Sequence, residues 1–215
     1  MKNYAELMFT EAVRGFQEAA GTADLYAETY PGRTKPQLGS EERAFLESRS
    51  TIYMASVSET GWPYVQHRGG PVGFLKVLDG ETVGFTDYRG NRQFISQGNL
   101  ARDDRVSLFA MDYPRRARLK LQGHAVVTAA ADAPELVEQL ATDGEGKVER
   151  VVRIRIVAFD WNCSQYITPR FDEAEVHALV APHLAARDRA IARLSDRLRA
   201  LGEDPDPYLK DPDND

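Results

Sequence analysis

Residues 74–94 read FLKVLDGETVGFTDYRGNRQF, and this stretch decides the fold class. Apolar, β-branched and aromatic residues stand on both sides of Asp79-Gly80. Asp-Gly between two such runs is a strong signal for the turn of a β-hairpin. Polar residues follow the second run, and a helical pattern starts near Asn91. The stretch therefore predicts two antiparallel strands that lead into a helix.

The same strand pattern extends on both sides of this hairpin. Residues 51–70 form another predicted hairpin around SETGWP, and single strands are predicted at 105–113, 117–129 and 149–162. About six strands in hairpin order indicate a largely antiparallel sheet. Glycines at four points of the strand region allow bends, so we expect the sheet to close into a small barrel. The predicted class is mainly β with added helices (α+β).

Helical patterns lie before, within and after the strands. Residues 3–20 predict one amphipathic helix that ends at Gly21, and Ser40 is the predicted N-cap of a short helix. Asp132 is a candidate cap for the helix of DAPELVEQLATD, with Pro134 in its first turn. From Asp172 to about Leu201 the chain reads as one more helix. Its apolar stripe contains Val176, Leu179, Val180, Leu184, Ile191, Leu194 and Leu198.

These patterns divide the chain into four segments. We expect a helical lead-in and loop at 1–39, a barrel domain at 40–170, and C-terminal helices at 171–202 that pack on the barrel or on a dimer. The acidic tail at 203–215 is predicted to be disordered.

Composition excludes several classes of function. The 215 residues carry a net charge of −6 with a pI of about 5.3, which argues against a nucleic-acid-binding protein. Cys163 is the only cysteine, which fits a reducing compartment and predicts a cytoplasmic protein. We expect neither a signal peptide nor a membrane span, because charges interrupt the N-terminal pattern and no apolar run is long enough. Dinucleotide, phosphate-loop and metal-ligand motifs are absent from the sequence.

Three polar clusters are candidate site segments. In the first, Arg89 and Arg92 offer forked donors beside Gly90, at a predicted helix start near Asn91. This arrangement suits a phosphate, although a solvated turn would have the same residues. The second cluster is Gln66 to Arg68, on a predicted strand, where at least one side chain should point into the barrel. The alternative is an edge strand with solvated side chains.

The third cluster is AFDWNCSQYITPRF at the end of the last strand. Trp161 and Tyr166 have rings that can stack on a planar ligand, and Asn162 and Gln165 can bond to its edges. The alternative interpretation makes Trp161 a core aromatic residue. Cys163 is interpreted as inert packing.

Together, the polar strand, FTDY before NR and a helix, RLKLQG, and the Trp-containing last strand resemble the pyridoxamine 5'-phosphate oxidase-like family of FMN-binding split barrels. The resemblance covers roughly residues 40–170 and points to a branch other than the vitamin B6 enzyme itself, because the substrate-binding C-terminal segment of that enzyme is not recognisable. It implies an antiparallel split barrel, FMN as cofactor, and a homodimer with the flavin at the subunit interface. Asn91 stands where the family has a second basic residue, and Arg89 is the candidate to compensate.

The resemblance also implies roles for individual residues. Arg89, Arg92 and N–H groups near Asn91 would hold the phosphate, and the second cluster would lie along the flavin ring. The third cluster would form a far wall, contributed by a second subunit. The implied cofactor-binding residues are Gln66, His67, Arg68, Phe85, Thr86, Asp87, Arg89, Asn91, Arg92, Arg118, Gln122, Trp161, Asn162 and Gln165.

The expected activity is that of an FMN-dependent oxidoreductase acting on a small molecule, with an unidentified electron donor. His67 is a weak candidate for a proton donor, because its ordinary pKa is near neutrality. Two alternatives stay open. One is a flavin-binding or stress-associated protein without turnover, and the other is the same barrel using a deazaflavin or haem.

Overall fold

The computed structural model of the chain describes residues 1–29, 37–142, 146–162 and 164–209. Most of the predicted loop before Ser40, the end of the predicted disordered tail, and Cys163 lie outside these ranges. The chain divides into two compact units, Met1–Thr168 and Pro169–Asp215.

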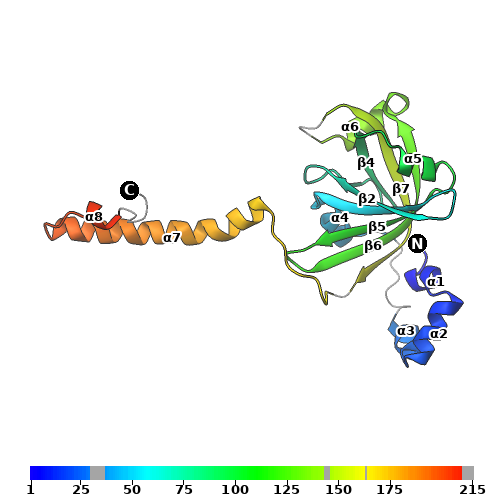
Figure 1. Cartoon of the computed structure of the whole chain (residues 1–215), viewed down its shortest axis with the longest axis horizontal. Helices are drawn as coiled ribbons and strands as arrows, with labels where there is room; N and C mark the ends of the chain where they lie inside the picture. Colours follow the sequence, from blue (N-terminus) through cyan, green and yellow to red (C-terminus); the bar gives the residue numbers. More distant parts are fainter. Residues whose placement is uncertain (30–36, 143–145, 163, 210–215) are drawn as a thin grey trace. The chain divides into compact units, whose positions relative to one another are not determined.

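The first unit is built on one antiparallel sheet, which confirms the predicted α+β class (Figure 1). Its seven strands within the described residues are hydrogen-bonded in the order β2-β1-β5-β6-β7-β4-β3. They are β1 (Thr51–Val57), β2 (Pro63–Gly69), β3 (Lys76–Val77), β4 (Thr82–Tyr88), β5 (Arg105–Asp112), β6 (Ala117–Ala129) and β7 (Val148–Asn162).

Both predicted hairpins are confirmed. Strands β1 and β2 pair from Thr51 opposite Gly69 to Val57 opposite Pro63. In the second hairpin, the Asp79 carboxylate accepts a hydrogen bond from the Glu81 N–H at 2.7 Å and fixes the turn. Strand β3 has only two residues, so this hairpin is shorter than its apolar pattern suggested.

The sheet curls round on itself, as expected for a split barrel. Strands β2 and β4 are not hydrogen-bonded neighbours in the sheet order. Even so, a guanidinium nitrogen of Arg68 on β2 lies 2.9 Å from a carboxylate oxygen of Asp87 on β4. This curvature brings residues near the two ends of the strand order together.

A bulge between β6 and β7 contributes to this curvature. The register shifts between Gln122 and Gly123. A Cβ atom at position 123 would lie 2.6 Å from the carbonyl oxygen of Arg155, so only glycine fits. Bulges bend and twist a strand, and here the bend falls in the longest pair of the sheet.

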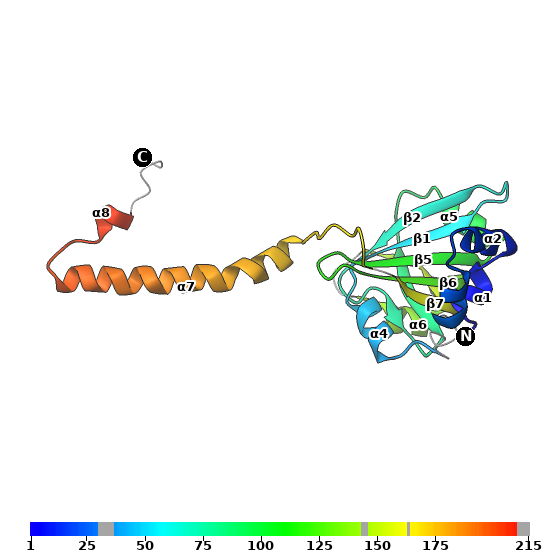
Figure 2. The ribbon, with the colours of Figure 1, turned by 90° about the horizontal axis from the view of Figure 1, so that it is seen from below.

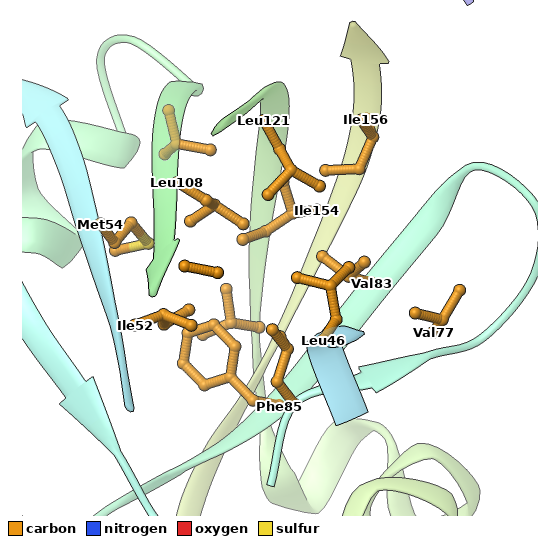
Figure 3. Packing of buried hydrophobic residues seen from close by; sticks show 14 of the residues in the cluster. Leu46, Ile52, Met54, Val77, Val83, Phe85, Leu108, Leu121, Ile154 and Ile156 are labelled. Atoms are coloured by element: carbon orange, nitrogen blue, oxygen red, sulfur yellow. The ribbon is translucent and has the colours of Figure 1, made fainter. Parts of the chain in front are cut away.

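Alternating apolar side chains of the strands fill the interior (Figure 3). Leu46 of the helix after Ser40 enters the same cluster and is fully buried. Phe85 packs edge-on against Phe74, with 6.3 Å between ring centroids. This core fixes the orientation of β4 and therefore of the polar residues at its end.

The N-terminal helical prediction was wrong in detail. Residues 3–20 contain α1 (Tyr4–Met8) and α2 (Glu11–Ala19), and α3 (Ala23–Thr29) was not predicted. The break occurs because Thr10 caps a new helix, accepting from the Val13 N–H at 3.5 Å. In Figure 2, α1 lies beside β6 and β7, and the ammonium of Lys120 sits 4.7 Å from the Tyr4 ring centroid.

Two predicted helix caps were also wrong. Helix α4 (Ser40–Glu47) begins one residue earlier than expected, with Gly39 as N-cap and its N–H donating to Glu42 at 2.9 Å. Helix α6 (Pro134–Leu140) follows the 3₁₀ turn Ala130–Asp132, and its N-cap is Ala133, which offers no side-chain bond. Pro134 does occupy the first turn, as predicted.

The second unit consists mainly of helix α7 (Glu173–Ala200). Its predicted start is confirmed, because Asp172 accepts from the Glu175 N–H at 2.8 Å and Glu175 bonds back to the Asp172 N–H. Helix α8 (Asp206–Leu209) lies within the tail that was predicted to be disordered. In the described parts of the chain, no helix combines the length and apolar character that a membrane crossing requires.

Candidate functional site

A small cavity lies where the inward face of β2 meets the end of β4. Its volume is about 80 Å³, well below the roughly 300–1,000 Å³ of sites that enclose a whole small-molecule ligand. It is lined by Tyr64, Gln66 and Arg68 of β2, by Asp87, Tyr88 and residues 90–97, and by Arg150 of β7. A cavity of this size has room for a compact group such as a phosphate.

Asp87 joins two arginines at the base of this cavity. Its two carboxylate oxygens accept from Arg68 at 2.9 Å and from Arg150 at 2.8 Å. Arg150 stands directly opposite Asp87 in the β4–β7 register, and all three side chains are less than one-fifth exposed. The arginines are therefore held in place by a shared, largely buried carboxylate.

A further ion pair lies at the rim of the cavity. Arg92 donates to Glu149 at 2.9 Å, and Arg150 lies 3.4 Å from the other oxygen of the same carboxylate. The Arg92 guanidinium lowers the pKa of Glu149 below its ordinary value. Together the three arginines and two carboxylates carry one net positive charge. This excess favours an anion.

The loop between β4 and the next helix has an unusual backbone. Arg92 and Phe94 both adopt left-handed conformations, with φ of 61° and 55°. Non-glycine residues in this region cost about 1–3 kcal/mol each, and such strain is often found at functional sites. Helix α5 (Ile95–Leu100) begins only after this loop. The predicted helix start near Asn91 was therefore wrong, and the helix is too short for its terminus to serve as an anion site.

The left-handed loop places Phe94 against the arginine cluster. The guanidinium carbon of Arg150 lies 5.5 Å from the Phe94 ring centroid, and that of Arg68 lies 5.9 Å from the Phe85 ring centroid. Guanidinium groups stack favourably on aromatic faces. The two rings thus restrict where the guanidinium planes can lie.

The side chains of β2 alternate across the sheet. Gln66 and Arg68 line the cavity, and Gln66 accepts from the Ser96 hydroxyl of α5 at 2.6 Å. His67 points to the opposite face, where its ring lies 5.9 Å from that of Tyr53 in an edge-on contact. The structure therefore brings together two of the three predicted residues of this strand and separates His67 from them.

The remaining residues of the FTDYRGNR segment divide between the cavity and other surroundings. Asn91 lines the cavity, and its side chain accepts from the Gln93 N–H at 3.2 Å. Arg89 is exposed and does not line the cavity. Thr86 is buried, and its hydroxyl has no hydrogen-bond partner among the described residues. Phe85 belongs to the core.

A family model described as pyridoxamine 5'-phosphate oxidase matches residues 38–159, which is more than half of the chain. The chain belongs to the pyridoxamine 5'-phosphate oxidase family. The match includes every residue that lines the cavity. No curated protein matches the sequence.

The solved structures that match the chain are distant in sequence. A putative pyridoxamine 5'-phosphate oxidase from Lactobacillus delbrueckii is 21% identical, with a TM-score of 0.47, and covers 60% of this chain and 97% of its own. HupZ from Group A Streptococcus is 14% identical, with a TM-score of 0.45, and covers 62% and 99%. An FMN-binding protein from Syntrophomonas wolfei is 9% identical, with a TM-score of 0.41, and covers 71% and 96%.

Other predicted site residues of this family member lie away from the cavity, on a second surface. Arg118 and Gln122 alternate with the core residues of β6, and Asn162 of β7 stands opposite Arg118 in register. Gln122 donates to Ser107 at 3.0 Å. The Nε of Arg118 is buried without a hydrogen-bond partner among the described residues.

Trp161 is a packing residue within the barrel. Its indole N–H donates to the buried carboxylate of Glu42 at 2.8 Å, and its ring meets Phe45 edge-on with 4.7 Å between centroids. The structure thus agrees with the alternative interpretation of Trp161 as a core aromatic. Gln165 is exposed beyond the end of β7, beside the fully exposed Tyr166.

Sequence reasoning missed Arg150, Glu149 and Ser96. Arg150 and Glu149 belong to a strand whose alternating pattern was recognised, but only the pairing register places Arg150 opposite Asp87. The sequence showed that an arginine lies on that strand. It did not show that this arginine pairs with Asp87, because 63 residues separate the two.

Proposed function

We propose that the chain binds FMN with its phosphate in the cavity between β2, β4 and β7, as a homodimer in the cytoplasm. The observation that carries this proposal is the convergence of Arg68, Arg92 and Arg150 from three separate segments. Forked guanidinium donors match phosphate oxygens in geometry and charge. Family membership supports the same ligand class.

The residues present fit a phosphate. Arg68 retains a buried Nε donor without a hydrogen-bond partner among the described residues, and buried donors normally have one. A side chain at Gly90 would meet no atom within 4 Å, so a ligand can approach the backbone there. Asp87 opposes phosphate binding, because it already accepts hydrogen bonds from Arg68 and Arg150. Binding would therefore require Arg68 and Arg150 to share their donors between Asp87 and the phosphate.

The size of the cavity supports a second subunit. About 80 Å³ admits the phosphate but leaves the ring system of a flavin outside. Arg118, Gln122 and Asn162 lie elsewhere on the sheet, and Gln122 also donates to the Tyr4 hydroxyl of α1 at 3.4 Å. We assign these residues, and the exposed Gln165, to contacts with the ring of a flavin whose phosphate is held by the other subunit. Arg89 would add charge at the rim, and Thr86 and Phe85 would act by positioning the end of β4.

Bound FMN would supply the redox chemistry itself. The chain would bind the phosphate through its arginines and orient Gln66 through Ser96. We propose an oxidoreductase acting on a small molecule. The position of His67 on the opposite face of β2 leaves it outside the cavity, so as a proton donor it would act only on a ligand bound at that outer face.

Cofactor content tests the proposal directly. The purified protein should show flavin absorbance, and mass spectrometry should identify FMN released on denaturation. A Soret band, a co-purifying deazaflavin, or a colourless protein that fails to bind added FMN would contradict it. Anaerobic mixing with NADH and NADPH then separates an enzyme from a binder, because an enzyme using either donor would bleach the bound flavin.

Substitutions of Arg68 and Arg150 test whether the FMN phosphate binds in this cavity. Arg68→Ala and Arg150→Ala should each weaken FMN binding by about 10- to 100-fold, because a charge-assisted hydrogen bond contributes about 1.5–3 kcal/mol. Each single variant leaves Asp87 one arginine. Arg102→Ala is the matched control, since Arg102 pairs with Glu59 on the surface and does not line the cavity. Fluorescence titration with FMN measures all three, and unchanged affinity in both cavity variants would refute the assignment.

A further inference from the structure

Helix α7 carries an apolar seam that is exposed within the second unit. Its members recur at alternating intervals of four and three residues from Val180 to Leu201, with one polar interruption at Arg187. The apolar members are Val180, Leu184, Ile191, Leu194 and Leu198 of α7, and its C-cap residue Leu201. All but Leu198 are exposed, and Leu194 and Leu201 are more than 60% exposed.

This spacing differs from that of a helix that packs on a sheet. Alternating steps of three and four give an average repeat of about 3.5 residues, which is the repeat of a two-stranded coiled coil. The seam is sustained for about three heptads, the length at which such a pattern becomes informative. Pro182 lies on the side of the helix away from the seam, so its missing N–H does not interrupt the contact face.

An isolated helix of this kind has little reason to be stable. Most helical stability in proteins comes from packing of the apolar face, and the seam of α7 is exposed. We propose that α7 pairs with α7 of a second copy of this chain in an antiparallel coiled coil. The proposal stands on α7 alone and does not depend on the flavin.

Arg187 determines the orientation. In a parallel, in-register pair, Arg187 would face Arg187 of the second copy inside the seam, which places like charges together. In an antiparallel pair, Leu184 can lie opposite Leu201, Arg187 opposite Leu198, and Ile191 opposite Leu194. The flanking positions then bring Ala190 beside Arg197 and Asp188 towards Ser195, which is buried within its own unit. No like-charged pair arises in this register.

Cysteine cross-linking in the full chain tests both the partner and the orientation. In a Cys163→Ser background, chains carrying Arg187→Cys and chains carrying Leu198→Cys are co-expressed with different affinity tags and oxidised with copper phenanthroline. The expected product is a disulfide-linked dimer that contains both tags. Neither variant oxidised alone should form a covalent dimer. Absence of the mixed dimer, or efficient cross-linking of Arg187→Cys alone, would overturn the proposal.

A matched pair of leucine substitutions controls for non-specific effects. Leu194 lies in the seam, whereas Leu179 is also exposed on α7 but lies outside the repeat. Adding Leu194→Asp to both chains should reduce the mixed cross-link at least tenfold, and adding Leu179→Asp should leave it within twofold. Equal loss from both would overturn the seam assignment. FMN content is read from the same preparations, so a protein without flavin that still cross-links separates this proposal from the proposed function.

Discussion

At the scale of single residues, Asp87 decides how much positive charge the cavity presents. It bonds to Arg68 and Arg150 at once, and it stands opposite Arg150 in the sheet. A carboxylate in this position holds the two guanidinium groups in place, but it also competes with any incoming anion for their donors. Organisation of the site and affinity for a phosphate are therefore opposed at this residue.

Replacing Asp87 should separate these two effects. Asp87→Asn removes one negative charge and should strengthen FMN binding by about threefold to tenfold, within the range expected for a partly buried charge. The same change should lower the free energy of unfolding, because two arginines lose their counter-charge. Glu59→Gln, at an exposed ion pair, is the control. FMN titration and urea unfolding measure both quantities, and weaker FMN binding would show that ordering of the arginines matters more than charge.

Asp103 gives a pH-dependent prediction at the same scale. Hydrogen bonds from the side chain and the N–H of Arg105 lower its pKa from 3.8 to about 2. A carboxyl group with a lowered pKa stabilises the folded chain above its unfolded pKa. This contribution should be lost as the pH falls from 3.8 through about 2. Carboxyl-detected NMR titration should find this low pKa, and Arg105→Gln should return it towards 3.8. A normal pKa in the unmodified chain would contradict the ion pair.

At the scale of elements, structures set by neighbouring residues could be predicted from the sequence, and contacts between distant segments could not. The two hairpins could be predicted because their turns lie between neighbouring strands, and Asp79 fixes one of them through a bond two residues away. The start of α5 could not, because the loop before it depends on contacts with β7. Phe94 stacks on Arg150, which is 56 residues away in the sequence. The same limit applies to the site, where Arg68 was predicted and Arg150 was missed.

The bond between Trp161 and Glu42 attaches α4 to the end of β7. Trp161→Ala should lower the free energy of unfolding by about 3 kcal/mol, near the lower end of values for aromatic truncation because the ring is only partly buried. Trp62→Ala is the matched control, since Trp62 is 76% exposed and should change stability by less than about 0.5 kcal/mol. Chemical denaturation compares the two. Equal, small losses would place Trp161 outside the core.

At the scale of the whole molecule, the chain consists of a sheet unit and a helical unit joined by an irregular segment. Residues 164–172 contain no helix or strand, and Arg170 within them is exposed. The limit between the units falls after Thr168, and the predicted barrel domain at 40–170 stays a prediction. The surface against which the second unit packs could not be predicted from the sequence, because an apolar stripe on a helix does not identify its partner.

Limited proteolysis should detect this segment. Trypsin should cut after Arg170 before it cuts after Arg150, because Arg150 lies within β7 and is largely buried. Mass spectrometry of early digests should therefore find a fragment ending at Arg170, and Arg170→Gln should abolish it. Early cleavage after Arg150 would mean that β7 is not stably paired.

The ion pair between Arg68 and Asp87 has one more consequence. In the described residues it joins strands that share no backbone hydrogen bonds, so the closure of the sheet at that point depends on charge. Strand β2 is already an edge of the sheet, and the ion pair holds β4 beside that edge, so loss of the pair would uncover its unpaired backbone groups. Open edges recruit strands from other molecules and start aggregation. The contact that shapes the cavity therefore also protects the solubility of the chain.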